Sequence, residues 1–291
     1  MKKTIVEYKD RGIAQITVSD ERWYSKTTYD QITKKENTIY VPSVTWISSF
    51  YPKGIGFMKW LASKGWDEAE AIKSAAGDKG SKVHYAIVAL LDGQDVKMDS
   101  KFNNPSTGEG EELTLEEYEA ILSFAAWFTE VRPEILLREI VVFNDKEGYA
   151  GTCDFVCRIT DPKTKAASLY LIDFKTSQYL WPEHEIQISA YKHALIGQSI
   201  PDFKMGEAVT FDDKLNLAIL QLGYRFNKKK FKFTDVEDQF DLFLAAKKIW
   251  QKEASAQQPS VKDYPTSICL PKPEVKKEEV KKEDGASPRK T

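Results

Sequence analysis

The sequence predicts an α/β fold in which a mixed central sheet is flanked by helices. Strand-like and helix-like segments alternate from about residue 41 to residue 254. Within that span, the strand-like segments 151–157 and 168–176 are joined by the polar, turn-rich connector 160–167, which makes them an antiparallel hairpin. The 291 residues can fill one large hydrophobic core or two small ones. We expect a folded domain at 41–254, a strand-and-turn appendage at 1–40 and a disordered charged tail at 255–291.

The N-terminal elements follow from local patterns. Residues 13–18 are strand-like, and the polar stretch 34–38 predicts a turn before a short strand at 39–41. Ser43 is a candidate N-cap for a helix that ends at 52–54. Further helical patterns cover 57–60 and about 67–91, where Asp92-Gly93 stops the helix. Residues 99–112 are rich in Asn, Ser, Gly and Glu, which predicts an exposed loop.

The C-terminal elements begin with a capping box. Thr114 and Glu117 have the spacing of that motif, and they predict a helix that reaches about residue 131. There follow a strand at 135–143, the hairpin described above, a helix at 182–195, a second hairpin built from 217–222 and 231–234, and a helix at 238–252. Residues 275–284 carry charges of both signs and no apolar core, which is typical of a disordered segment.

Two carboxylates and a lysine in the first hairpin suggest a chemical site. Side chains alternate along a strand, so Asp173 and Lys175 point the same way. If the hairpin pairs symmetrically about its connector, Asp154 lies directly opposite Asp173, about 5 Å away. A divalent cation between them would remove their repulsion, and the lysine would supply a donor for an anionic substrate. This pattern predicts a metal-dependent phosphodiesterase site.

Other polar residues in apolar surroundings have two readings each. His84 shares a helix face with apolar residues and is either a core histidine or a ligand, and Gly80 one turn earlier permits close approach of backbone or phosphate. Glu139 lies in an apolar strand, where a carboxylate needs a partner or a metal unless the strand is an edge. Gln187 and Tyr191 share a helix face, which alone indicates only a polar flank.

Taken in order, these motifs resemble those of a known family. The motifs are Gly80-x-x-x-His84, Glu139, Gly151-Thr-x-Asp154, Asp173-x-Lys175-Thr176 and Gln187-x-x-x-Tyr191. Their order and spacing are similar to those of the RecB-type branch of the PD-(D/E)XK nuclease superfamily. The segment 41–46 also resembles the start of phage and mitochondrial exonuclease members of that branch. The resemblance implies a restriction-endonuclease-like core and a divalent-metal-dependent DNA nuclease.

The resemblance also implies the metal ligands. They would be His84, Asp154, Asp173 and the main-chain carbonyl of Phe174. Hard carboxylate oxygens suit Mg²⁺ or Mn²⁺, and an imidazole ligand shifts the preference toward Mn²⁺. Relatives with an iron–sulfur cluster have four cysteines in a pattern that this chain lacks, so no cluster is expected.

The remaining site residues receive roles from the same resemblance. Lys175 would position the attacking water and stabilise charge on the scissile phosphate. Gln187 and Tyr191 would brace the site and touch the substrate, and Glu139 would support the site from the neighbouring strand. The implied activity is that of an exonuclease acting from DNA ends in replication, recombination or repair, with a recombination or replication protein as a partner. A flap or structure-specific endonuclease, a restriction-type endonuclease and a non-catalytic DNA-binding module are the alternatives.

Composition constrains how such a protein meets DNA. The net charge of −2 gives no global attraction to nucleic acid, so DNA binding requires a local positive groove. The basic stretch 227–232 is either a solvated turn or such a patch. Three cysteines without framework spacing indicate a reducing compartment, and no apolar run approaches the roughly 18 residues of a membrane span. We expect a cytoplasmic protein, in the host cytoplasm if a phage encodes it.

Overall fold

A mixed five-stranded sheet forms the centre of the fold. The computed structural model describes residues 3–8, 12–18, 21–31, 34–201, 208–254, 258–259 and 269. The sheet has the order β13-β12-β9-β8-β7, and only the β12–β9 pair is parallel. Its strands are β7 (Glu134–Asn144), β8 (Tyr149–Thr160), β9 (Ala167–Lys175), β12 (Asn216–Leu222) and β13 (Phe231–Val236). The predicted α/β class with a mixed central sheet is therefore confirmed.

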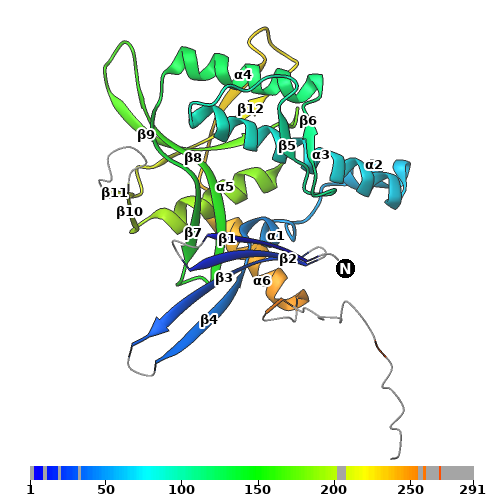
Figure 1. Cartoon of the computed structure of the whole chain (residues 1–291), viewed down its shortest axis with the longest axis vertical. Coiled ribbons are helices and arrows are strands. Elements are labelled where there is room, and N and C mark those ends of the chain that lie inside the picture. The colour runs from blue at the N-terminus through cyan, green and yellow to red at the C-terminus, as the bar shows by residue number, and fades with distance from the viewer. Residues whose placement is uncertain are drawn as a thin grey trace, which may run out of the picture. The chain divides into compact units, whose positions relative to one another are not determined.

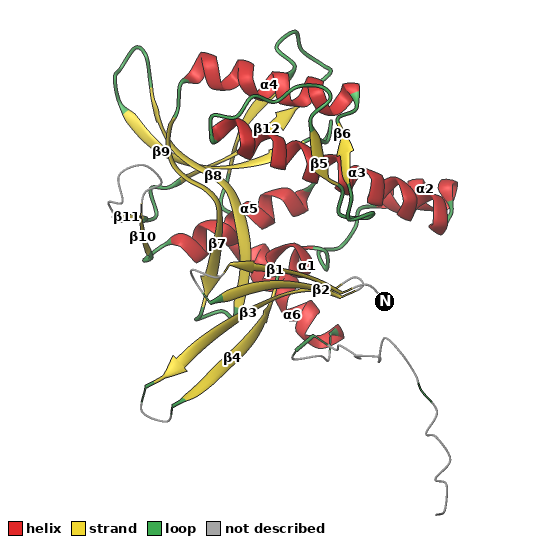
Figure 2. Ribbon diagram, viewed as in Figure 1, coloured by secondary structure: helices red, strands yellow, loops and turns green. Residues whose placement is uncertain are grey.

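Helices pack on both faces of this sheet (Figures 1 and 2). On one face, α3 (Trp66–Leu91) and α4 (Leu115–Val131) bury an apolar cluster with the sheet residues Phe155, Phe174 and Leu220. On the other face lies α5 (Pro182–Leu195), which contacts α6 (Phe240–Glu253) and α1 (Val44–Ser48). Because side chains alternate along β9, Phe174 faces α3 and α4 while Asp173 and Lys175 face α5.

Helix boundaries follow the capping signals in the sequence. The Thr114 side chain accepts from Glu117 N and the Glu117 carboxylate accepts from Thr114 N, so the predicted capping box is present at the start of α4. Ser43 caps α1, which ends at Ser48, several residues before the predicted stop at 52–54. The helix α2 (Ile55–Lys64) covers the short helical pattern predicted at 57–60.

The N-terminal residues form a four-stranded antiparallel sheet. Its strands are β1 (Lys3–Tyr8), β2 (Ile13–Val18), β3 (Glu21–Asp30) and β4 (Lys35–Pro42), in that order. The prediction of a turn at 34–38 was wrong for residues 35–38, because these polar residues pair with β3 on an exposed strand and only Lys34 lies in a turn. The strand β4 runs across the expected domain boundary at residue 40. Trp23 of β3 packs edge-on against Trp46 and Trp250, which joins this sheet to α1 and α6.

Short elements complete the described residues. The strands β5 (Lys101–Asn103) and β6 (Gly110–Glu112) form a hairpin within the stretch predicted as an exposed loop. That prediction was wrong in part, because the buried Asn104 side chain donates to Glu111 and orders the turn. The pair β10 (Ser199–Pro201) and β11 (Ala208–Thr210) follows α5. Apart from 258–259 and 269, the expected disordered tail lies outside the described residues.

Among the described residues, every helix is too short or too polar to cross a membrane.

Candidate active site

The candidate site lies where β8 and β9 stop pairing. Their antiparallel ladder ends at Phe155 and Ile172, although β9 continues to Lys175. Beyond that point the Phe174 N–H donates to the Asp154 side chain, with a distance of 2.8 Å to Oδ2. A carboxylate therefore takes the place of a backbone acceptor where the two strands stop pairing.

Three carboxylates form a row across adjacent strands at this point. The β7–β8 ladder pairs the residues on each side of Glu139 with those on each side of Asp154. Extended by one residue, the β8–β9 register places Asp154 opposite Asp173, as the symmetric hairpin predicts. Glu139 has a φ of 44°, a left-handed conformation that is uncommon outside glycine and marks local strain. The row is thus built at an irregular point of the sheet.

His84 reaches this row from α3. Its Nε2 lies 3.1 Å from the carbonyl oxygen of Phe174. Its Nδ1 lies 3.5 Å from Asp154 Oδ1 and 3.9 Å from Glu139 Oε1. Its ring packs edge-on against Phe174 of the apolar cluster, while both ring nitrogens face polar oxygen atoms. Of the two readings of His84, the geometry therefore favours a site residue over a core histidine.

The atoms around His84 fit a cation. One ligand atom each from His84, Glu139 and Asp154 lies within 4.8 Å of the others. An imidazole nitrogen and carboxylate oxygens are suitable donors for Mn²⁺ or Mg²⁺. Glu139 belongs to this donor set even though β7 is an edge strand of the central sheet. Asp173 lies beside the set but is engaged by a lysine.

That lysine is Lys175, and α5 holds it from the other side. Its Nζ lies 2.5 Å from Asp173 Oδ2 and 3.4 Å from Gln187 Oε1. The Gln187 amide in turn donates to the Tyr191 hydroxyl at 2.8 Å. A continuous polar chain therefore runs from Asp173 to Tyr191, and the Gln187 and Tyr191 pair is more than a polar flank.

Charge and burial oppose each other across the site. Burial raises the pKa of Glu139 to about 7, and the charge of Asp154 acts in the same direction. Burial also raises the pKa of Asp173, to about 6, against the effect of Lys175. For Asp154, burial is outweighed by the His84 charge and hydrogen bond, which lower its pKa. The carboxylates thus repel one another and depend on nearby cations for their charged state.

The two basic groups remain protonated in this field. Burial lowers the pKa of His84, but the charges of Asp154 and Glu139 outweigh burial and raise it to about 9. Burial likewise lowers the pKa of Lys175. The charges of Asp173 and Asp154 outweigh burial, so the pKa of Lys175 lies above its ordinary value. Lys175 is therefore an ammonium group, suited to donating hydrogen bonds rather than to removing a proton.

The two glycines of the motifs differ in their surroundings. A Cβ on Gly151 would lie 2.4 Å from Tyr191 Cε1, so the tyrosine ring occupies the space that a side chain would need. A Cβ on Gly80 would meet only Thr176 Oγ1, at an ordinary 3.8 Å. Gly151 is therefore required by packing within the protein, whereas Gly80 borders the side chain of Thr176.

Several site neighbours gave no signal in the sequence. The Tyr24 hydroxyl of β3 lies 2.9 Å from Thr152 Oγ1, which attaches the N-terminal sheet to the strand that carries Asp154. His184 of α5 has a pKa lowered to about 3 by burial and then by the charges of Lys175 and Lys53, so it is neutral beside the catalytic lysine candidate. These contacts join residues far apart in the chain, which no local spacing reveals.

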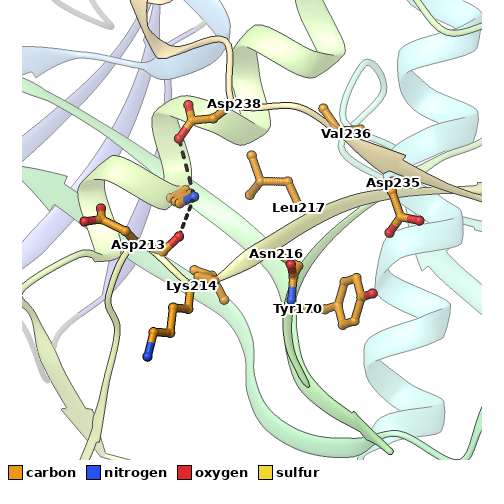
Figure 3. Close-up of a pocket in the computed structure, with 10 residues that line it drawn as sticks. Tyr170, Asp213, Lys214, Asn216, Leu217, Asp235, Val236 and Asp238 are labelled. Carbon is orange, nitrogen blue, oxygen red and sulfur yellow. Dashed lines mark hydrogen bonds and ion pairs between the residues drawn. The ribbon is translucent and has the colours of Figure 1, made fainter. Parts of the chain in front are cut away.

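A separate cavity of about 340 Å³ lies where the β9–β12 ladder begins, near Tyr170 and Asn216, whereas Lys175 lies where that ladder ends (Figure 3). Lys192 is buried there between the Asp213 carbonyl oxygen at 3.1 Å and Asp238 Oδ2 at 3.5 Å. These bonds attach α5 to the segments on either side of the second hairpin. The cavity contains none of the predicted site residues.

No protein-family model matches the sequence, and a search of curated proteins finds no match either.

Proposed function

We propose that this protein is a divalent-metal-dependent DNA nuclease with a PD-(D/E)XK core of the RecB type. The observation that carries the proposal is the row Glu139, Asp154 and Asp173, flanked by His84 and Lys175, where two strands of a mixed sheet separate. Five residues from four separate motifs converge on one place. Carboxylates and an imidazole can hold a divalent cation, and an ammonium group can stabilise charge on a phosphate, so the set suits phosphodiester hydrolysis.

The donor set divides into holding and positioning groups. His84, Glu139 and Asp154 would hold the cation, joined by Asp173 and the Phe174 carbonyl. The bound cation would polarise the phosphate and lower the pKa of a water. Lys175 would donate to the phosphate oxygens as negative charge grows on them. Gln187 fixes the direction of that ammonium group, and Tyr191 fixes Gln187.

We propose further that the enzyme is an exonuclease that acts from DNA ends in replication, recombination or repair, in the cytoplasm and with a replication or recombination protein as a partner. A flap or structure-specific endonuclease would use the same donor set. The rival from another class is a non-catalytic DNA-binding module. It is disfavoured because Asp154, Asp173 and Lys175 are all present and in contact with partners that hold them in place.

The decisive experiment is cleavage of end-labelled single- and double-stranded DNA with Mn²⁺, with Mg²⁺ and with EDTA. Cleavage should require the metal, and Asp173→Asn should abolish it, whereas the exposed Asp95→Asn should not. A covalently closed single-stranded circle should resist degradation if a free end is needed. Full activity in EDTA would sink the metal assignment, and rapid cutting of the circle would replace the exonuclease with an endonuclease.

A further inference from the structure

A second cavity, of about 390 Å³, lies beyond the C-terminal ends of β9 and β12, at the same end of the sheet as Lys175. Gln178 and Tyr179 line it from the β9–α5 connection, and Tyr224 and Phe226 line it from the turn that joins β12 to β13. The function of this cavity is not explained by the proposed catalytic groups. Its lining combines three aromatic rings with one basic residue, Lys232.

The rings of the cavity are available to a ligand. Tyr179 and Phe226 are 65% and 63% exposed, and their ring centroids are 6.0 Å apart. Tyr224 packs edge-on against Phe226, with 5.3 Å between centroids. Exposed aromatic side chains gathered in one hollow are unusual on a protein surface unless something covers them. Their flat faces suit a planar partner.

The turn that carries two of these rings is rich in basic side chains. Residues 224–232 contain five basic side chains and no acidic one. Arg225 and Lys229 are paired with Glu116 and Glu130 of α4, and Lys232 lies over the Tyr224 ring. Within the described part of the chain, Lys228 and Lys230 are exposed and form no ion pair. The basic turn is thus partly neutralised, but two lysines remain for phosphate groups.

Hydrogen bonds connect the walls of the cavity to the end of β9 that carries Lys175. Gln221 of β12 pairs with Lys175 in the parallel register, lines the cavity and donates to Ser177 O at 2.9 Å. Gln178 donates to Gly223 O and accepts from Arg225 N, which joins the β9–α5 connection to the basic turn. The cavity therefore adjoins the end of β12 that pairs with Lys175.

We infer that this cavity is a stacking subsite for the unpaired bases of single-stranded DNA, which it would guide to Lys175. Tyr179 and Phe226 would stack on bases, and Lys228 and Lys230 would contact the backbone phosphates. Charge complementarity argues for a polyanion, and the flat aromatic lining argues for unpaired bases rather than a duplex. The inference rests on the proposed function and adds the class of substrate.

The test measures binding without cleavage. A fluorescent 16-mer of thymidine and a matched 16-mer without bases are titrated in EDTA by fluorescence anisotropy. The wild type should prefer the thymidine strand. The double variant Tyr179→Ala, Phe226→Ala should lose at least about tenfold in affinity for it and should no longer distinguish the two strands. Tyr29→Ala, at another exposed tyrosine, is the matched control.

A second pair of variants tests the lysines. Lys228→Ala with Lys230→Ala should weaken binding of both strands and reduce the slope of log affinity against log salt, by about 0.7 for each phosphate group that the variant no longer binds. Lys163→Ala, at an exposed lysine on the β8–β9 turn, should change neither quantity. Equal salt slopes for the double variant and the wild type would show that Lys228 and Lys230 do not contact phosphate groups.

The outcomes separate this inference from the nuclease proposal. Cleavage of DNA in Mn²⁺ together with unchanged thymidine binding by the aromatic double variant would overturn the subsite and leave the nuclease. Ring-dependent binding without any cleavage would support the subsite and overturn the nuclease. Equal affinity of the wild type for both strands, or binding of duplex alone, would also overturn the subsite. If the cavity binds an acidic protein and not DNA, it is a protein-docking surface and the base-stacking subsite is overturned.

Discussion

Lys175 lies between the Asp173 carboxylate and the Gln187 side-chain amide, and this position determines its proposed role in the reaction. Asp173 and Gln187 hold its ammonium group, and the charges around it keep it protonated. It is therefore a fixed positive charge close to the carboxylate row. A group of this kind stabilises charge that grows during the reaction more than charge already present in the substrate.

Replacing Lys175 with alanine should therefore lower the rate of DNA cleavage by about 100-fold or more, the scale seen when one oxyanion donor is removed. Metal binding should persist because the carboxylates remain, and DNA binding should persist because most contacts with the bound substrate are made elsewhere. Single-turnover rates and anisotropy separate the two effects. The control is Lys163→Ala, on the exposed β8–β9 turn, which should behave as the wild type. A Lys175→Ala protein with near wild-type cleavage would refute the nuclease proposal.

His84 makes metal binding depend on pH. Its pKa of about 9 in the metal-free protein exceeds the ordinary value of 6.5, so the imidazole is charged at neutral pH and must lose its proton to bind a cation. Mn²⁺ affinity should rise with pH up to about 9, with about a tenfold gain per unit for one proton. Glu139, with a pKa of about 7, adds a second proton at lower pH. Titration of free Mn²⁺ by electron paramagnetic resonance measures this dependence.

The same proton should affect stability in the opposite direction. The raised pKa means that the His84 contribution to the stability of the metal-free fold is complete below about pH 6.5 and is lost as pH rises toward 9. In EDTA, urea unfolding should show this decline for the wild type and a flatter profile for His84→Gln. A His84→Gln protein that keeps the full pH dependence of Mn²⁺ affinity would exclude His84 as a ligand.

At the scale of elements, one close contact fixes how α5 lies on β8. Gly151 and Tyr191 are in contact across the two elements, and a Cβ on Gly151 would also lie 3.2 Å from Val44 Cγ2 of α1. Tyr191 is buried, so its ring has little room to move. The position of Gln187, and through it that of Lys175, depends on this contact.

Gly151→Ala should therefore destabilise the fold by about 1–3 kcal/mol, as overpacking of a core does, and should lower cleavage as well. Gly77→Ala is the matched control, because a Cβ at that helical position meets nothing within 4 Å. Urea unfolding and cleavage rates are the measurements. Adding Tyr191→Leu should recover part of the stability lost by Gly151→Ala but not the cleavage rate. Wild-type stability of Gly151→Ala would show that the ring moves aside freely.

At the scale of the whole molecule, the described core ends with α6. Phe243 and Trp250 are buried, and Trp250 packs against Trp46 and Trp23. Removing residues 255–291 should leave cleavage and the urea midpoint unchanged. Phe243→Ala should instead cost about 3–5 kcal/mol. A truncated protein that loses activity while it keeps its stability would place a substrate contact in the tail.

Sequence reasoning reached the elements whose signals are local. The Thr114 and Glu117 box and the symmetric hairpin around 160–167 follow from spacing alone, and the fold confirms both, with the ladder ending one pair short of Asp154 and Asp173. It did not reach the pairing of polar residues 35–38 with β3, which depends on a partner strand. The contacts of Tyr24 with Thr152 and of Tyr191 with Gly151 join distant segments, so periodicity gave no hint of them.

Where β8 separates from β9, Asp154 and His84 also bind the main chain of β9. The Phe174 N–H donates to the Asp154 carboxylate, and the Phe174 carbonyl oxygen lies within hydrogen-bond distance of the His84 imidazole. The groups proposed for chemistry therefore also satisfy main-chain groups that the sheet leaves unpaired. Asp154→Asn keeps an acceptor for that N–H, whereas Asp154→Ala leaves it unsatisfied, at a cost of about 1–3 kcal/mol. Both variants should be inactive, and only the alanine variant should unfold early in urea. Folding therefore restricts this position to side chains that offer an acceptor to the Phe174 N–H, whereas the proposed catalysis requires the charged carboxylate.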